Sequence, residues 1–355
     1  MTPGRALPTP ALHRLLVAET EHPAWAGPAW STPGSVSEPP VAVGPQAQVH
    51  RAVWSDGRDV AVKIQHPGAR ARVGENRARM SRMAVLLRMM SPHTSAEALM
   101  DELQQAALAE LDFRQEAANQ QAFSVAYRDD PEIFVPEVVY ASDRLLVTSW
   151  VAGVPLAEVI DHGPRSLRDR TGRILTSLQL DAPARVGLLH ADPARDNLRL
   201  LNDGRLAVLD FGAVARLPAG LPPEFGELLR AAVDRDGHRL RTILGRLGVV
   251  ADGPGPDPQT LLTLAEATVL PALQPGFRFD SGWLRRRVVA LMFNRRNVSV
   301  VRHLRMPPGH LLLSRAIVGT VDTLCALEAS TDYRAALTRW LPGFAPTDPR
   351  TERTG

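Results

Sequence analysis

The sequence predicts an α+β fold of two lobes, a small β-rich N-terminal lobe with inserted helices and a larger, mostly helical C-terminal lobe. Strand patterns with tight turns occupy residues 41–65 and 134–150, whereas helical patterns dominate beyond residue 153. The 355 residues, 45% of them hydrophobic, suffice for two cores. We expect a Pro-rich, poorly ordered leader over 1–40, lobes over 41–152 and 153–345, and a disordered tail over 346–355.

Each lobe has its own order of elements. Strands over 41–65 turn at Asp56-Gly57 and precede helices over 75–91 and 95–128, the second with apolar residues at four-residue intervals. Strands over 134–140 and 145–150 end at Gly153 and Pro155, which we interpret as a hinge. A hairpin then turns at Asn202-Asp203-Gly204, and the last helices are expected over 223–248, 258–270, 281–294 and 310–340.

Composition disfavours nucleic-acid-binding, disulfide-bonded, exported and membrane-spanning classes of protein. The net charge of +3 gives weak support for nucleic acid as a partner, and we expect none. The single cysteine, Cys325, cannot form an internal disulfide and fits a small core position in a reducing compartment. The N-terminal residues lack the apolar run of a signal peptide, and no uncharged segment is long enough to cross a bilayer. We therefore expect a cytoplasmic protein, in peripheral contact with a membrane at most.

Lys63 is the only lysine among 41 basic residues, and it follows the β-branched run Val60-Ala61-Val62. A strand lysine places one compact charge on nucleotide phosphates and can share it with a glutamate, a role that suits a planar guanidinium poorly. An ordinary strand lysine with its ammonium in solvent would show the same pattern. The rest of the chain favours the phosphate role.

Asp192 and Asn197 stand five residues apart, and Asp210-Phe211-Gly212 follows the next hairpin. Phosphoryl transfer needs a carboxylate for the acceptor proton, then an amide oxygen and a second carboxylate for magnesium. With Lys63 and an acidic helix upstream, the order of these motifs predicts a protein-kinase-like fold that binds ATP and Mg²⁺. His190, which begins this loop, is interpreted as structural rather than as a base.

The chain resembles the UbiB/AarF/ADCK atypical kinase-like family over about residues 38–344. The residues that carry the resemblance are Gln48–Ala52, Asp59–Gly68, Glu110–Asn119, Gly187–Pro193 and Leu206–Leu217. It implies that Lys63 binds the α- and β-phosphates, that Asp192 is the catalytic aspartate, and that Asn197 and Asp210 hold Mg²⁺. It also implies nucleotide contacts from the strand end at Ser149 and Val151.

The resemblance places an acidic pair at Glu110 and Asp112, while Glu116 is the better candidate to pair with Lys63. In a straight helix Glu116 lies near the face of Asp112 but about 120° from Glu110, so the three carboxylates cannot converge. Which glutamate pairs with Lys63 therefore stays open in the sequence.

Three departures from the family pattern suggest weakened activity. A K-x-G-Q signature has no counterpart in this sequence, because the only lysine lies in the strand. The alanine-rich nucleotide loop is replaced by Val41–Ala47, in which Pro45 removes one amide. Between Asp192 and Asn197 the usual His-Pro-Gly is Ala194-Arg195-Asp196, which adds a carboxylate beside the expected metal site.

Three interpretations of function follow. The first is an ATP-binding atypical kinase or ATPase that acts on a lipid or small molecule, which the resemblance connects with isoprenoid quinone biosynthesis. The second is a nucleotide-binding pseudokinase scaffold, and the third is a small-molecule kinase similar to aminoglycoside phosphotransferases, which the motif Glu110–Asn119 disfavours. A protein acceptor is disfavoured because few residues separate Gly212 from Pro223. The arginines of 285–287, 295 and 296 could meet anionic lipid or form a solvated helix face.

Overall fold

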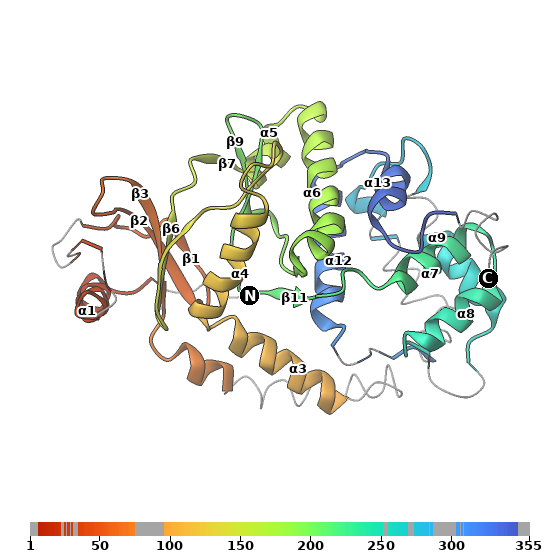
Figure 1. Ribbon diagram of the computed structural model, residues 1–355, viewed down its shortest axis with the longest axis horizontal. Coiled ribbons are helices and arrows are strands. Elements are labelled where there is room, and N and C mark those ends of the chain that lie inside the picture. The colour runs from red at the N-terminus through yellow and green to blue at the C-terminus, as the bar shows by residue number, and fades with distance from the viewer. Residues whose placement is uncertain are drawn as a thin grey trace. The chain divides into compact units, whose positions relative to one another are not determined.

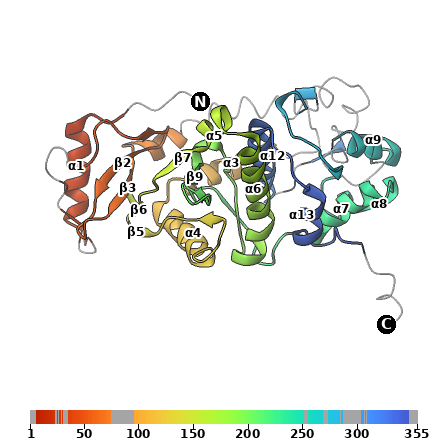
Figure 2. The same ribbon diagram turned by 90° about the horizontal axis from the view of Figure 1, so that it is seen from above.

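The structure is a computed structural model, shown in two views in Figures 1 and 2. It describes residues 6–22, 25, 27–28, 30, 35–74, 96–250, 255–268, 273–283, 285–286, 303–305, 307 and 309–346. Contacts divide the chain into two compact units, and each is described by itself. The first comprises Met1–Arg79, Gln104–Val154 and Asn197–Ala213, and the second comprises Met80–Leu103, Pro155–Asp196 and Val214–Gly355. The hairpin after Asn197 thus groups with the first unit, although the expected boundary at 152/153 assigns it to the second.

A five-stranded antiparallel sheet forms the first unit's β-rich part, in the order β1-β2-β3-β6-β5. The strands are β1 (Ala42–Val43), β2 (Ala47–Val53), β3 (Asp59–Gln65), β5 (Val138–Ala141) and β6 (Leu145–Ser149). The turn between β2 and β3 contains Gly57 at φ 89°, as its Asp-Gly sequence predicts. Alternation along β3 sends Val60, Val62 and Ile64 to one face and Lys63 to the other.

A helix covers the face that carries Val62, and over Thr9–Thr20 it corrects the expectation of a poorly ordered leader. Residues Thr9–Thr20 form α1, whose Leu12 and Leu16 are buried in one cluster with Val62. Figure 2 shows α1 alongside β2 and β3. The sequence signal for this helix was weak, because its few apolar residues at four-residue spacing lie close to prolines and polar residues. Since a helix this short is marginal by itself, burial of Leu12 and Leu16 accounts for its structure.

The expected helix over 95–128 is two helices, α3 (Ala96–Ala109) and α4 (Phe113–Ala126). The chain breaks at Glu110–Asp112, and the Asp112 carboxylate caps α4 by accepting from the Gln115 amide at 2.9 Å. Phe113 and Ala117 of α4 pack on Ala47 and Leu146, on the sheet face opposite to α1. The first unit therefore has α4 on the face from which Lys63 projects. The expected helix over 75–91 lies outside the described residues.

A second sheet of the first unit has the order β4-β10-β9-β7. Its strands are β4 (Ile133–Phe134), β7 (Gly153–Pro155), β9 (Leu198–Leu201) and β10 (Leu206–Val208). The expected strand over 134–140 is therefore split between two sheets, and the expected hinge at Gly153 is a strand. A Cβ at Gly153 would lie 3.0 Å from the Leu200 carbonyl oxygen, so this glycine permits close strand approach. The hairpin expected around Asn202–Gly204 is β9–β10.

The second unit is mostly helical, with one small sheet in which β8 (Leu188–His190) pairs with β11 (Val214–Arg216). Its described helices include α5 (Leu156–His162), α6 (Arg165–Val186), α7 (Pro223–Val233), α8 (Gly237–Arg246), α9 (Pro258–Thr268), α12 (Leu311–Leu327) and α13 (Tyr333–Trp340). The helices expected over 223–248 and 310–340 are each broken in two. Residues with positive φ end the first halves, and Asp236 and Asp332 cap the second halves.

Three further expectations concern this unit. Cys325 is buried in α12, and burial raises the pKa of its thiol to about 12, as expected for a core position. Among the helices that the structure describes, none has both the length and the apolar character needed to cross a bilayer. Most of the expected helix over 281–294, with Arg287, Arg295 and Arg296, and most of the expected tail lie outside the described residues.

Candidate active site

Lys63 lies on the central strand β3 and makes an ion pair with Glu116 of α4. Its Nζ donates to Glu116 Oε1 at 2.7 Å and to Oε2 at 2.9 Å. The Glu116 side chain is 1% exposed and that of Lys63 20% exposed, so the pair is nearly removed from water. Lys63 thus pairs with Glu116, the better candidate in the sequence, which had left open the choice between the glutamates.

Asp210 completes a three-residue charge cluster, because its Oδ1 lies 3.2 Å from Lys63 Nζ. The Asp210 side chain is 42% exposed, and this is the side of the cluster that solvent reaches. Its backbone has φ 60°, in the left-handed region that non-glycine residues seldom adopt. Strain of this kind persists at functional sites because the surrounding structure holds it.

The cluster changes the proton affinities of both partners. Burial alone would lower the pKa of Lys63, but the charges of Asp210 and Glu116 outweigh it and hold that pKa above its usual value. Burial raises the pKa of Glu116 to about 7, against the pull of the Lys63 ammonium, and Asp210 and Glu110 add to the rise. Lys63 is therefore a fixed positive charge at neutral pH.

The other two acidic candidates lie at the break between α3 and α4. Asp112 uses its carboxylate to cap α4. Glu110 lies beside the Asp210–Gly212 turn, since a Cβ at Gly212 would be 3.7 Å from Glu110 Cα and 3.5 Å from Glu116 Oε2. The helix break thus lets Glu110 and Glu116 lie near one turn, which a straight helix would not allow.

Asn197 begins the β9–β10 hairpin that leads to Asp210. Its carbonyl oxygen accepts from the Leu209 amide at 2.8 Å, which brings the two ends of the hairpin together. An amide oxygen at Asn197 and a carboxylate at Asp210 are hard oxygen ligands, and Mg²⁺ commonly takes one or two carboxylates with phosphates and water. Among the described residues no group of three or more His, Cys, Asp or Glu side chains gathers as a metal site. The donor set fits a magnesium ion held jointly with a phosphate.

Sequence reasoning missed the function of Asn119. Its Nδ2 donates to the Phe211 carbonyl oxygen at 3.0 Å, and its Oδ1 accepts from Gln115 Nε2 at 3.0 Å. Phe211 is buried with its ring 4.9 Å from that of Phe123. The sequence did contain one indication of this role, because Asn119 follows Glu116 by three residues and therefore lies on the same helix face.

Asp192 belongs to the second unit, where α12 holds its loop. Arg315 Nη2 lies 3.3 Å from Asp192 Oδ2, and Thr323 Oγ1 donates to the Pro193 carbonyl oxygen at 2.7 Å. Gly319 lies between Arg315 and Thr323 on α12 and packs closely on Pro193, since a Cβ atom added to Gly319 would lie only 3.1 Å from Pro193 Cδ. These α12 residues recur every four positions, so one helix face supports the loop. The sequence did not reveal Arg315, because its partner is distant along the chain.

His190 has the structural position expected for it. It is 1% exposed, and its Nδ1 accepts from the Asp192 amide at 3.3 Å. Gln179 Nε2 of α6 donates to the His190 carbonyl oxygen at 3.1 Å and to Thr320 Oγ1 at 3.0 Å. Helices α6 and α12 therefore both fix the start of the Asp192 loop.

The expected nucleotide loop is a short turn between β1 and β2. The Gly44 amide donates to the Ala47 carbonyl oxygen at 2.8 Å, and Pro45 has no amide hydrogen. At the end of β6, Ser149 donates its amide to Glu137 and accepts from the Glu137 amide through Oγ. Val151 is buried. The nucleotide contacts expected of Ser149 and Val151 remain predictions.

A strand lysine held by a helix glutamate, next to the aspartate of a DFG turn, defines a protein-kinase-like domain. The chain belongs to the ABC1 atypical kinase-like family, whose domain model matches residues 27–244. The match agrees with the family resemblance of the sequence motifs and favours it over the aminoglycoside-phosphotransferase interpretation.

Solved and curated relatives agree with this membership. The chain matches the structure of the Rv3197–erythromycin complex from Mycobacterium tuberculosis with 35% identity and a TM-score of 0.78, over 96% of this chain and 85% of that one. It is 31% identical to atypical kinase COQ8B, mitochondrial, of Rattus norvegicus, over 58% of this chain and 39% of the relative. It is 28% identical to Protein ACTIVITY OF BC1 COMPLEX KINASE 1, chloroplastic, of Arabidopsis thaliana, over 61% and 33%. The chain therefore spans well under two thirds of the length of these two curated relatives.

Proposed function

We propose that the chain binds Mg-ATP and transfers its γ-phosphate or hydrolyses it, as an atypical kinase or ATPase. The observation that carries this proposal is the position of Lys63, whose ammonium lies 2.7 Å from Glu116 and 3.2 Å from Asp210. Protein kinases use such a strand lysine, helix glutamate and DFG aspartate to hold nucleotide phosphates and magnesium.

Each residue then has a distinct role. Lys63 would bind the α- and β-phosphates, and buried Glu116 would keep its ammonium in place. Asn197 and Asp210 would hold Mg²⁺, which neutralises phosphate charge when it is bound. Asp192 would accept the proton of the acceptor hydroxyl or of water, with Arg315 orienting its carboxylate.

The acceptor class proposed is a lipid or small molecule, in a pathway of isoprenoid quinone type, with the protein peripheral to a membrane. One support is the short connection after the DFG turn, where β11 ends at Arg216 and α7 begins at Pro223. This connection leaves little chain for the long activation segment that protein substrates require. The atypical kinase COQ8B among the relatives agrees with a kinase-like activity in this family.

The alternative within the family is a nucleotide-binding scaffold without turnover. The short β1–β2 turn offers few amides to phosphate, and Arg195–Asn197 form one turn of 3₁₀ helix where the family pattern has a glycine. Both features favour weak catalysis.

Binding of a macrolide is a second candidate function. It is favoured by the 35% identity to Rv3197 over 96% of this chain, because that relative's structure is a complex with erythromycin. Calorimetric titration with erythromycin tests it, with and without Mg-ADP. Saturable binding would support this function, and absence of heat at millimolar erythromycin would exclude it.

The test of the main proposal is phosphate release from Mg-ATP by the wild type and Asp192→Asn, with Asp203→Asn, in the exposed turn of the β9–β10 hairpin, as the control. We expect release above background in the wild type and the control, and a large loss in Asp192→Asn. Nucleotide binding without any release would favour the scaffold. Equal release in all three proteins would contradict the role of Asp192.

A further inference from the structure

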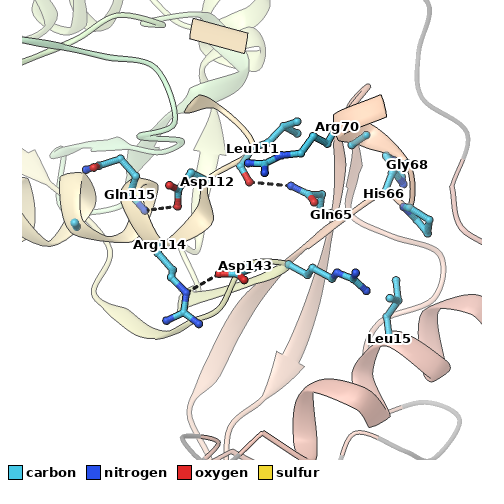
Figure 3. A pocket seen from close by; sticks show the side chains of 14 residues that line it. Leu15, Gln65, His66, Gly68, Arg70, Leu111, Asp112, Arg114, Gln115 and Asp143 are labelled. Carbon is cyan, nitrogen blue, oxygen red and sulfur yellow. Dashed lines mark hydrogen bonds and ion pairs between the residues drawn. The ribbon is translucent and has the colours of Figure 1, made fainter. Parts of the chain in front are cut away.

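A cavity of about 830 Å³ opens on the first unit, away from Asp210. It lies where the end of β3, the start of α4, the β5–β6 turn and α1 meet (Figure 3). Its lining includes Leu15, Gln65, Arg70, Leu111, Arg114 and Arg144. Cavities that hold small organic ligands have volumes of about 300–1,000 Å³.

Three arginines and two aspartates line the cavity, which leaves an excess of one positive charge, and the charges of Arg70 and Arg144 both act on Asp143. Arg114 Nε pairs with Asp143 Oδ1 at 2.7 Å, and the Asp112 carboxylate is occupied in capping α4. Within the described part of the chain, the guanidiniums of Arg70 and Arg144 have neither an ion pair nor a hydrogen bond. Two planar guanidiniums that line one cavity suit a phosphate or carboxylate, which each can bind through paired hydrogen bonds.

The remaining lining is suited to an apolar body with hydrogen-bonding groups. Leu15, Pro67, Leu111 and Ala118 supply apolar surface from several elements, and Gln115 adds an amide. His66 is buried, which lowers the pKa of its imidazole, and its Nε2 lies 3.2 Å from the Gly44 carbonyl oxygen. His66 therefore remains neutral at pH 7 and adds no positive charge.

We propose that this cavity is a binding site for an organic anion, with a phosphate or carboxylate held by Arg70 and Arg144 and a compact apolar body against Leu15 and Leu111. A free phosphate ester and a lipid headgroup share this chemistry.

The cavity and the Lys63 cluster are built on the same two elements. Gln65 follows Lys63 by two residues on β3, and its Nε2 donates to the Leu111 carbonyl oxygen at 2.9 Å, just before α4 (Figure 3). Gln115 and Ala118 line the cavity on α4, and Glu116 lies between them in sequence. A ligand held between β3 and α4 would therefore stabilise the Lys63–Glu116 pair, and by reciprocity a nucleotide would tighten the ligand. Only this coupling depends on the proposed function.

The binding test is calorimetric titration with phenyl phosphate, in the absence of nucleotide and metal. The proteins are the wild type, the Arg70→Ala/Arg144→Ala variant, and Arg128→Ala as a control for removal of an exposed arginine in the same unit. We expect saturable binding in the wild type and the control, weakened about tenfold or more in the double variant, because the anion would lose both of its charge-assisted contacts. Phenol, which lacks the anion, should bind far more weakly.

Two outcomes would overturn the site. The first is no saturable binding of phenyl phosphate to the wild type at millimolar concentration. The second is equal binding by the double variant, and displacement by Mg-ADP in that case would place the ligand at Lys63. Because the titration contains no nucleotide, its failure leaves the proposed kinase or ATPase function untouched.

Sedimentation with phosphatidylglycerol vesicles, against phosphatidylcholine vesicles, identifies the source of the anion. Binding to anionic vesicles that is lost in the double variant supports a lipid headgroup, and phenyl phosphate binding without vesicle binding supports a free small molecule. Vesicle binding that the double variant retains would exclude the lipid source at this cavity.

The sole lysine gives a separate test of the coupling. Protein labelled with ¹⁵N at lysine Nζ contains one side-chain signal, from Lys63. We expect phenyl phosphate to shift this signal in the wild type and in Arg128→Ala but not in the double variant. A signal that stays fixed while calorimetry detects binding would overturn the coupling.

Discussion

Asn119 Nδ2 donates a 3.0 Å hydrogen bond to the carbonyl oxygen of Phe211. Asn119 lies three residues after Glu116 on α4, and Phe211 directly follows Asp210. One helix therefore fixes both the glutamate that pairs with Lys63 and the backbone that presents Asp210. This relationship makes α4 the element that organises the charge cluster.

Replacing Asn119 by alanine should loosen the DFG turn. The buried Phe211 carbonyl would lose its partner, which costs about 1–3 kcal/mol. Urea unfolding should detect this loss of stability, and calorimetric titration should detect weaker binding of Mg-ADP. Gln121→Ala, at an exposed position on the same helix, is the control and should change neither property. Nucleotide affinity that is unchanged in Asn119→Ala would contradict an organising role for α4.

The raised pKa of Glu116 predicts a pH dependence of stability. The folded state holds the Glu116 proton up to about pH 7, whereas an ordinary glutamate releases it near pH 4.5. The stabilisation that comes from binding this proton is therefore complete below about pH 4.5 and is lost as the pH rises to about 7. The wild type should therefore lose unfolding free energy as the pH rises through this range.

The comparison that isolates this effect is Glu116→Gln, which cannot titrate. The unfolding free energy of the wild type relative to this variant should fall between about pH 4.5 and 7, because the stabilising proton is lost. Urea unfolding at several pH values measures the difference. A difference that is constant across this range would mean that Glu116 titrates as an exposed carboxyl does.

The sequence predicted the sheet and the charge cluster better than it predicted the helices. The β-branched run before Lys63 indicated the strand β3, and the Asp-Gly turns indicated both hairpins, because these signals are local. The breaks at Glu110–Asp112 and Asp234–Asp236 were missed, since apolar spacing continues through them and only the capping aspartates mark the new helices. Arg315 depends on tertiary structure, which a single sequence does not reveal.

The burial of α1 predicts that its core residues contribute to global stability. Leu16 is 1% exposed in the cluster with Val62, so Leu16→Ala should cost about 2–5 kcal/mol. Val17, which is 36% exposed, supplies the control, and Val17→Ala should cost much less. Thermal unfolding distinguishes the two. If both substitutions changed thermal stability equally little, residues 9–20 would lie outside the core, as the sequence had predicted.

Arg315 should act on turnover rather than on stability. Its ion pair with Asp192 is partly exposed, so Arg315→Ala should cost less than about 1 kcal/mol of unfolding free energy. If Arg315 orients Asp192, kcat for phosphate release should fall about tenfold while KM for ATP changes little. Arg334→Ala, on the exposed face of α13, is the control. An unchanged kcat would exclude a positioning role for Arg315.

The most direct test of the central claim is a calorimetric titration of Mg-ADP into the wild type, Asp210→Asn and Asp203→Asn. Asp203 lies in the turn of the same β9–β10 hairpin and pairs with Arg205, so its substitution controls for loss of a carboxylate there. We predict saturable binding that requires Mg²⁺, is at least about tenfold weaker in Asp210→Asn, and is unchanged in Asp203→Asn. Binding that is equally strong in Asp210→Asn, or absent from the wild type, would contradict a nucleotide site at Lys63 and Asp210.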